Sequence, residues 1–219
     1  MMFGNGIGLV ESRRGKLDGR RDVQLELEGQ LRAGDILLER TPFRLTDSFI
    51  PGYWGHAAIW VGSETELRAL GIWDHPVVQP YQGDIRSGRR VAEALRSGVA
   101  LNSFAHFLNI DDLAVLRDQR PASLARADAV IQALREIGKR YDFTYDLQTR
   151  DRLGCAELVY HAYGDIDWPS RRDFGRVAIA PDHIAARAVG DAPLDIVALY
   201  IGGERVGEGR ADVMAELIR

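Results

Sequence analysis

At 219 residues, with 46% hydrophobic and 27% charged side chains, the chain is long enough to bury a core and has a globular composition, so we expect one domain with appendages. Its 28 basic and 32 acidic side chains give a formal net charge of −4, which argues against a general nucleic-acid-binding protein. No run of about 18 apolar residues occurs and the first residues lack the apolar segment of a signal peptide, so we expect no membrane span and a cytoplasmic location.

The predicted elements mix strands and helices. Residues 1–22 are rich in glycine and charge, have no clear period, and predict a poorly ordered lead-in. Apolar runs bounded by turn residues predict strands at 34–40, 56–62, 113–117 and 194–203, together with a strand pair or bent strand at 89–101. Helical patterns predict helices at 121–141, 155–164 and 180–190 and in the C-terminal tail, 206–219. Strands that cluster early and are interrupted by a long helix favour the α+β class.

Cys155 is the single cysteine, so no intrachain disulfide and no zinc cluster of thiolates can form. It follows Gly154 and opens a predicted helix. There the helix dipole and the unpaired backbone N–H groups favour the thiolate, which is the reactive form of cysteine. The same N–H groups can stabilise an oxyanion on an attacked carbonyl. Taken alone, a helical cysteine is more often a small buried hydrophobe.

A histidine and a glutamate on apolar strands are the candidate partners of this thiol. His56 begins the apolar run HAAIWVG, and a histidine on a rigid strand suits a general base that pairs with a thiolate. Such a base needs a polar group to fix its orientation, and Glu93, alone among apolar neighbours, is the best-placed carboxylate. Each also has a simpler interpretation, His56 as a satisfied core histidine and Glu93 as an edge-strand charge facing water.

The order of six segments is more specific than any single residue: GDILLER, GHAAIWVG, VAEAL with GV after it, LAVLR, YDF and GCAELVYHAYG. This series resembles the permuted papain-like cysteine hydrolases of the NlpC/P60 superfamily, YiiX/YaeF-like branch, from about Gly34 to Ile201. In ordinary NlpC/P60 enzymes the cysteine helix precedes the histidine strand. Here His56 precedes Cys155 by 99 residues (155 − 56), as in the permuted branch, which also includes lecithin:retinol acyltransferase-like proteins.

The resemblance implies a circularly permuted papain-like α+β fold in residues 23–205, with a small antiparallel sheet packed against the helix that starts with the cysteine. It implies Cys155 as nucleophile, His56 as general base and Glu93 as the orienting carboxylate, with no metal and no organic cofactor. Asp35 of the GDI turn matches a hallmark that is structural rather than chemical. The implied reaction is hydrolysis or acyl transfer at an amide or ester bond through an acyl-thioester. Its implied substrate is an N-acyl or lipid amide or a cell-wall-type peptide.

Aromatic residues near these positions are candidates for substrate binding. Tyr53 and Trp54 lie just before the histidine strand and Tyr141 precedes the cysteine helix, where they would line an acyl pocket or simply pack in the core. His161 lies nearly two helical turns past Cys155 on another face, so it is a poor catalytic partner. His183, in APDHIAA, has a helical context without a strand and is discounted as well.

Two other function classes stay open. A ligand-binding module without catalysis would keep the fold and use the cleft to hold a small molecule, and a redox-sensing protein would use Cys155 as a switch. The reactivity of the thiol against pH separates them from an enzyme, because a thiol paired with His56 stays reactive at lower pH than one influenced by the helix alone. The sequence leaves the oligomeric state open.

Overall fold

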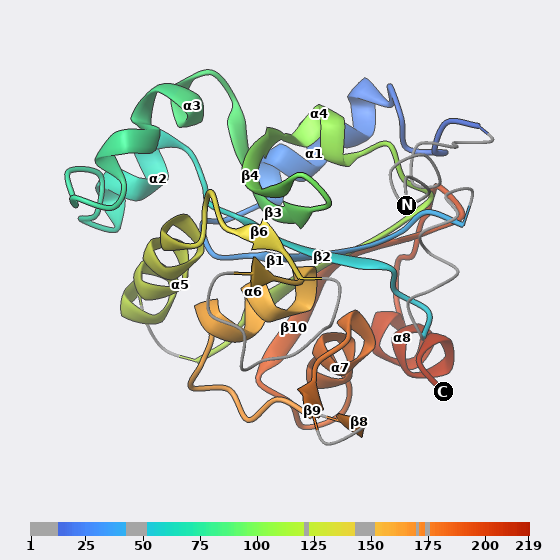
Figure 1. Cartoon of the computed structure of the whole chain (residues 1–219). Coiled ribbons are helices and arrows are strands. Elements are labelled where there is room, and N and C mark those ends of the chain that lie inside the picture. The colour runs from blue at the N-terminus through green and yellow to red at the C-terminus, as the bar shows by residue number, and fades with distance from the viewer. Residues whose placement is uncertain (1–12, 43–51, 121–122, 143–151, 170, 174–175) are drawn as a thin grey trace, which may run out of the picture.

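The computed structural model describes residues 13–42, 52–120, 123–142, 152–169, 171–173 and 176–219 (Figure 1). Its centre is a seven-stranded sheet in the order β11-β10-β5-β1-β2-β3-β4, with antiparallel neighbours throughout. The strands of this sheet are β1 (Ile36–Arg40), β2 (His56–Trp60), β3 (Arg89–Leu95), β4 (Gly98–Ser103), β5 (Asp112–Asp118), β10 (Leu194–Ile201) and β11 (Glu204–Arg205).

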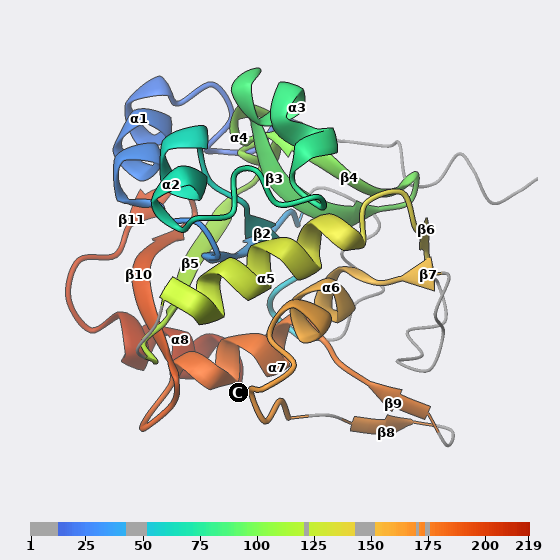
Figure 2. The same cartoon turned by 90° about the vertical axis from the view of Figure 1, so that its left-hand side faces the viewer.

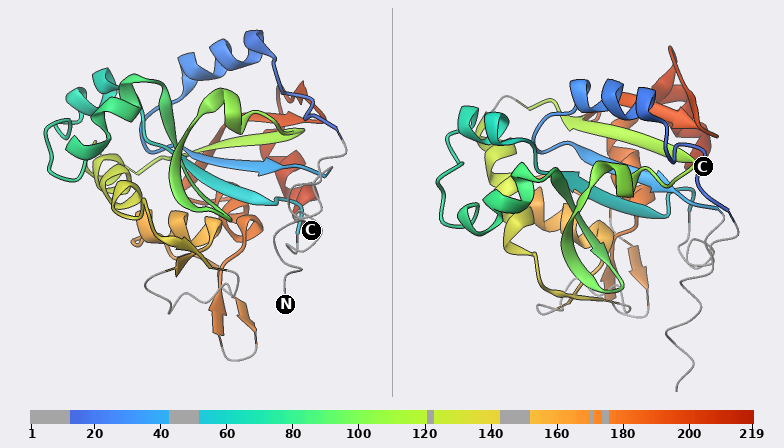
Figure 3. Two further views of the ribbon diagram at one scale, coloured as in Figure 1. Left: turned by 45° about the horizontal axis from the view of Figure 1, so that its top comes forward. Right: turned by 90° about the horizontal axis from the view of Figure 1, so that it is seen from above.

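Helices cover both faces of this sheet. In Figure 1 and Figure 3, α1 and α4 lie on one face, and α5, α6, α7 and α8 lie on the other. The helices are α1 (Arg21–Gln30), α2 (Glu64–Ala69), α3 (Gln82–Arg86), α4 (Phe104–Phe107), α5 (Ser123–Arg135), α6 (Cys155–Ala162), α7 (Pro181–Ala185) and α8 (Arg210–Leu217), with 3-10 turns η3 (Gln79–Tyr81) and η4 (Ala186–Ala188). Two small sheets complete the fold, the parallel pair β6 (Arg140–Tyr141) and β7 (Arg152–Leu153) and the antiparallel pair β8 (Arg171–Asp173) and β9 (Arg176–Ala178).

The alternation of side chains along β2 explains the two hydrophobic cores. Ala57 and Ile59 belong to the core that contains α5 and α6, whereas Ala58 and Trp60 belong to the core that contains α1 and α4. Successive residues of a strand point to opposite faces, so a strand buried on both sides must be apolar throughout. This requirement makes the histidine at the start of β2 conspicuous.

Most predicted elements are confirmed. The strands predicted at 34–40, 56–62, 113–117 and 194–203 are β1, β2, β5 and β10, and the segment 89–101 is the β3–β4 hairpin. The long helix predicted at 121–141 ends earlier, at Arg135, because Gly138 takes a left-handed conformation (φ +90°) and the chain then enters β6. The predicted tail helix is α8, whose Met214 is fully buried.

The N-terminal prediction was wrong for residues 13–22. Leu17 is fully buried in the α1 core, and its amide donates a hydrogen bond to the Ile110 carbonyl oxygen at 2.9 Å. The segment packs because a few well-spaced apolar side chains suffice when a preformed sheet face receives them, although glycine and charge dominate its composition. Residues 1–12 lie outside the described part of the chain.

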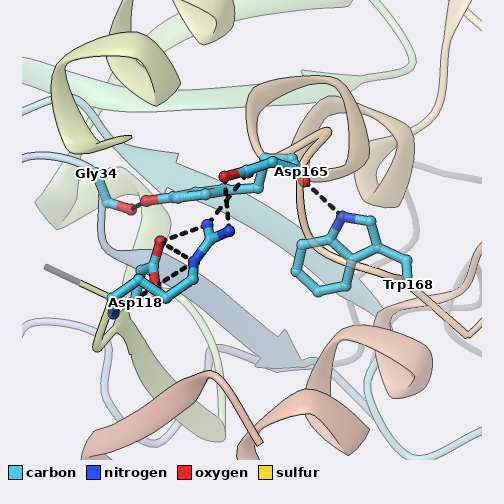
Figure 4. Close-up of polar contacts among 6 residues, drawn as sticks. Gly34, Asp118, Asp165 and Trp168 are labelled. Carbon is cyan, nitrogen blue, oxygen red and sulfur yellow. Dashed lines mark hydrogen bonds and ion pairs between the residues drawn. The ribbon is translucent and has the colours of Figure 1, made fainter. Parts of the chain in front are cut away.

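Polar contacts anchor the C-terminal end of α6 to the sheet (Figure 4). Tyr163, which follows α6, donates its hydroxyl hydrogen to the carbonyl oxygen of Gly34 at the entry to β1. Arg120, just beyond β5, pairs with both Asp118 and Asp165 at N–O distances of 2.6 Å. Because these partners come from β1 and β5, they fix where α6 lies against the sheet.

Asp35 has the structural role that its position suggested. It is 1% exposed and forms an ion pair with Arg117 of β5, with nitrogen–oxygen distances of 2.8 and 2.6 Å. It also accepts a hydrogen bond from the Arg32 amide, which closes the turn into β1. Within the described residues, no helix is both long and apolar enough to cross a membrane.

Candidate active site

His56 opens β2 and lies at the edge of the apolar run. Its ring is largely buried and contacts the Phe107 ring of α4, with ring centroids 6.5 Å apart. Its Nε2 lies 3.0 Å from Oε2 of Glu93 in β3. Sheet register explains the contact: Glu93 lies opposite Ala58, two residues along β2 from His56, so the two side chains share a face and meet on the diagonal. The structure therefore brings the predicted base and carboxylate together.

Glu93 has a second partner that the sequence did not reveal. The side-chain amide of Asn102 in β4 donates a hydrogen bond to Oε1 of Glu93 at 2.8 Å. Glu93 lies opposite Ala100, so Asn102 is again the diagonal neighbour two residues further along. Both carboxylate oxygens of a group that is only 3% exposed are thus satisfied. An asparagine within a hairpin strand gives no local signal, and only the register of β3 and β4 could have identified it.

Cys155 is the first residue of α6 and is 2% exposed. Gly154 before it is extended, and its amide donates to Oε2 of Glu157 at 2.6 Å, which closes the first turn of the helix. The thiol therefore sits at the positive end of the α6 dipole, as the sequence predicted. It is close enough to the His56 ring to act on it through charge and as a hydrogen-bond partner. Because Nε2 points to Glu93, Nδ1 is the nitrogen that remains for the thiol.

The electrostatics of the site favour a protonated His56 beside an ionised Glu93. Burial alone would lower the pKa of His56, but Cys155 and the Glu93 carboxylate outweigh it and hold that pKa well above the ordinary value of 6.5. Burial alone would raise the pKa of Glu93, but its hydrogen bond to His56, the imidazolium charge and the Asn102 amide lower it. The site therefore holds a cationic imidazole between a carboxylate and a sulfur, an arrangement suited to nucleophilic and proton-transfer chemistry.

The segment before His56 is held by two aspartates. Tyr53 is half-buried, and its hydroxyl donates to Asp112 at 2.7 Å. The amides of Tyr53 and Trp54 both donate to Asp182 of α7 at 2.8 Å. Trp54 is fully buried and its indole N–H points to the sulfur of Met214, so it packs in the core and offers no surface to a substrate. These contacts position the entry to β2.

The remaining candidates lie at different distances from the thiol. Tyr141 in β6 is half-buried and pairs with Leu153 in β7, two residues before Cys155, which places it beside the entry to α6. His161 faces Glu136, which directly follows α5, and its Nδ1 lies 3.5 Å from the carboxylate. His183 accepts a hydrogen bond from the Ala180 amide at the start of α7. Both discounted histidines thus have other partners.

Two comparisons find known proteins that are similar to this chain. A family model for the permuted papain-like amidase enzyme, YaeF/YiiX, C92 family, matches residues 30–205. The crystal structure titled metalloprotein yiiX from Escherichia coli O157:H7 matches with a TM-score of 0.56 and 17% sequence identity, covering 78% of this chain and 99% of that chain. A search of curated proteins finds no match. The structural likeness, at this identity, concerns the fold alone.

Proposed function

Since the chain belongs to the permuted papain-like amidases of the C92 family and is therefore a cysteine hydrolase of the amidase type, we propose that Cys155, His56 and Glu93 carry its reaction. The observation that supports these roles best is the position of the His56 ring. Its Nε2 is 3.0 Å from Glu93, and Cys155 is near enough to the same ring to raise the pKa of His56 through its charge and as a hydrogen-bond partner. A nucleophile, a base and an orienting group in contact in that order form the arrangement that nucleophilic catalysis requires.

In the acylation half of the proposed reaction, the Cys155 thiolate attacks the carbonyl carbon of an amide. The C–O double bond opens to an oxyanion. The Gly154 amide is already used by Glu157, so the Cys155 backbone N–H at the start of α6 is the donor proposed for that oxyanion. The His56 imidazolium then gives its proton to the leaving nitrogen, the C–N bond breaks, and an acyl-thioester remains on Cys155.

In the deacylation half, His56 takes a proton from water as the water oxygen attacks the thioester carbonyl. The second tetrahedral intermediate collapses, the C–S bond breaks, and the carboxylic acid leaves with the thiolate restored. Glu93 holds the ring in one orientation throughout and stabilises its cationic form, and Asn102 holds Glu93. An amine in place of water would give acyl transfer, and an ester would follow the same steps with an alcohol as leaving group.

The proposed steps use no metal ion. The structural neighbour is titled a metalloprotein, but in the described parts of this chain no three histidine, cysteine or carboxylate side chains gather as a metal site would require. The described residues near Cys155 thus offer no such donor set, and the steps are written without an ion. The substrates proposed are small-molecule or peptide amides, with esters and lipid-like acyl groups as extensions.

The test compares the rate of Cys155 alkylation by iodoacetamide against pH in the wild type, in His56→Ala and in Glu93→Gln. We expect the wild type to stay reactive at acidic pH because the imidazolium stabilises the thiolate, and both variants to require higher pH. A Cys155→Ala variant is the control for labelling elsewhere. Incubation with a panel of acyl amides, followed by mass spectrometry, should reveal an acyl adduct on the peptide that contains Cys155.

The outcomes separate the three function classes. Coincident pH profiles for the wild type and His56→Ala would contradict the proposed pair and leave a thiol influenced by the helix alone. Normal pairing with no acyl adduct from any amide or ester would favour the ligand-binding module. Turnover that survives in Cys155→Ala would remove the proposed nucleophile altogether.

A further inference from the structure

Two arginine side chains stand side by side on the short parallel pair that leads into α6. In the register of β6 and β7, Arg140 lies opposite Arg152 and Tyr141 lies opposite Leu153. Leu153 is fully buried and Tyr141 packs against the core. Because alternate residues of a strand point to opposite sides, Arg140 and Arg152 point to solvent, and both are exposed.

Across the described ranges, no carboxylate forms an ion pair with Arg140 or Arg152, whereas Arg13, Arg117 and Arg120 each pair with an aspartate. Neighbouring strands lie about 5 Å apart, and like charges directly opposite one another destabilise a sheet. An anion placed between the two guanidiniums would offset this repulsion.

The backbone that carries the pair lies near the start of α6. Arg152 precedes Cys155 by three residues, so their Cα atoms are at most about 10 Å apart. Figure 2 shows β6 and β7 beside the start of α6, near the turn of the β3–β4 hairpin. That turn packs closely on the residue that leads into β6: a Cβ added at Gly98 would lie 2.6 Å from the Lys139 carbonyl oxygen. The arginines are therefore held on paired backbone rather than on a free loop.

We propose that Arg140 and Arg152 form an anion-binding subsite beside Cys155, which holds a carboxylate or phosphate group of the substrate. Guanidinium groups bind both anions through paired hydrogen bonds, and two adjacent guanidiniums present several donors to one group. This subsite rests on the proposed function, because it would select among the acyl substrates that the Cys155 thiol attacks. It favours amides that carry a carboxylate or phosphate group near the scissile carbonyl.

The experiment uses alkylating reagents in place of the unidentified substrate. N-iodoacetyl-4-aminobutanoic acid carries a carboxylate at a distance from the reactive carbon. The corresponding carboxamide has the same shape without the charge and serves as the neutral control. N-iodoacetyl-ethanolamine phosphate tests a phosphate in place of the carboxylate. The readout is the ratio of the anionic to the neutral alkylation rate at Cys155. We expect this ratio to be about fivefold above that of a free thiol at low salt, the size of an exposed ion pair, and to fall as salt is added.

Three variants test whether the raised ratio comes from the two arginines. Arg140→Gln/Arg152→Gln should bring it to that of a free thiol, and Arg140→Lys/Arg152→Lys should keep part of it because the positive charges remain. Arg21→Gln makes a similar change of charge on α1, which lies on the other face of the sheet, and should leave the ratio as in the wild type.

A wild-type ratio equal to that of a free thiol, or a raised ratio that survives the double glutamine variant, would overturn the subsite. A raised ratio in only the carboxylate or only the phosphate arm supports it and identifies the source of the anion. Failure of the proposed function has another signature: alkylation by neutral iodoacetamide would then be insensitive to His56→Ala, whatever the ratio shows.

Discussion

Asn102→Ala tests the buried contacts that join His56, Glu93 and Asn102, at the residue that the sequence analysis did not identify. The substitution removes the amide that donates to Oε1 of Glu93 at 2.8 Å and leaves the contact between Glu93 and His56 in place. Since the carboxylate is 3% exposed, water cannot readily replace the lost donor. A hydrogen bond to a charged group contributes about 1.5–3 kcal/mol, so we expect the free energy of unfolding at pH 7 to fall by about that amount.

The same loss has a direction in pH. The pKa of Glu93 is lower in the folded protein than its ordinary value of 4.5, so its contribution to stability is present above that value and is lost as pH falls through the folded pKa. Asn102 is one cause of the lowering, and its removal raises the folded pKa. A change of 1.36 kcal/mol corresponds to one pKa unit. The acid limb, which is the pH range where stability is lost on acidification, should therefore shift to higher pH by about 1–2 units.

Denaturant unfolding from pH 3 to 8 measures both quantities, and a double-mutant cycle with Glu93→Gln isolates their cause. In the Glu93→Gln background residue 93 carries no charge, so Asn102→Ala should cost only the ~0.5–1.5 kcal/mol of a neutral hydrogen bond, and the acid limb should no longer move. Equal losses in the two backgrounds, or an acid limb that stays in place in the single variant, would refute the claim that Asn102 stabilises a buried carboxylate.

Two further substitutions test how the site is supported. Trp54→Ala should lower stability by about 3–5 kcal/mol in denaturant unfolding, because a fully buried indole that contacts Met214 is removed from the core; a loss below 1 kcal/mol would instead place this side chain at the surface of a cleft. Arg117→Leu should lower stability by about 3–5 kcal/mol because Asp35, which is 1% exposed, would lose its countercharge, and little change in the unfolding midpoint would show that the pair is dispensable.

The fold could be predicted to the extent that local patterns and segment order carried it. Strands and the Cys155 helix were read from apolar runs and turn residues, and the order of motifs gave the permuted papain-like fold, which the family and structural matches confirm. Helices α1 to α4 were missed because they are short or bury few residues: α2 buries only Leu67 and α1 only Val23 and Leu27. Such helices are defined by the surface that receives them rather than by their own period.

Side-chain pairing across strands was harder to predict than the identity of the chemical groups. A cysteine after a glycine at a helix start and a histidine in an apolar strand are local signals, and so could be found from sequence. Their partners are selected by register: Asn102 reaches Glu93, and Arg140 meets Arg152, only because particular residues of two strands lie opposite each other. Trp54 shows the reverse case: its place next to His56 in sequence suggested either a substrate contact or a core position, and the tertiary structure buries it in the core.

The register also explains why the orienting group is a glutamate. Glu93 lies opposite Ala58, so the His56 ring is a diagonal neighbour at a Cα separation of roughly 7–8 Å rather than a direct one. A long side chain crosses that distance and still leaves its second oxygen for Asn102 on the other diagonal. One carboxylate in the middle strand of three thereby links a histidine on β2 to an amide on β4, and the geometry of the sheet sets the orientation of the imidazole.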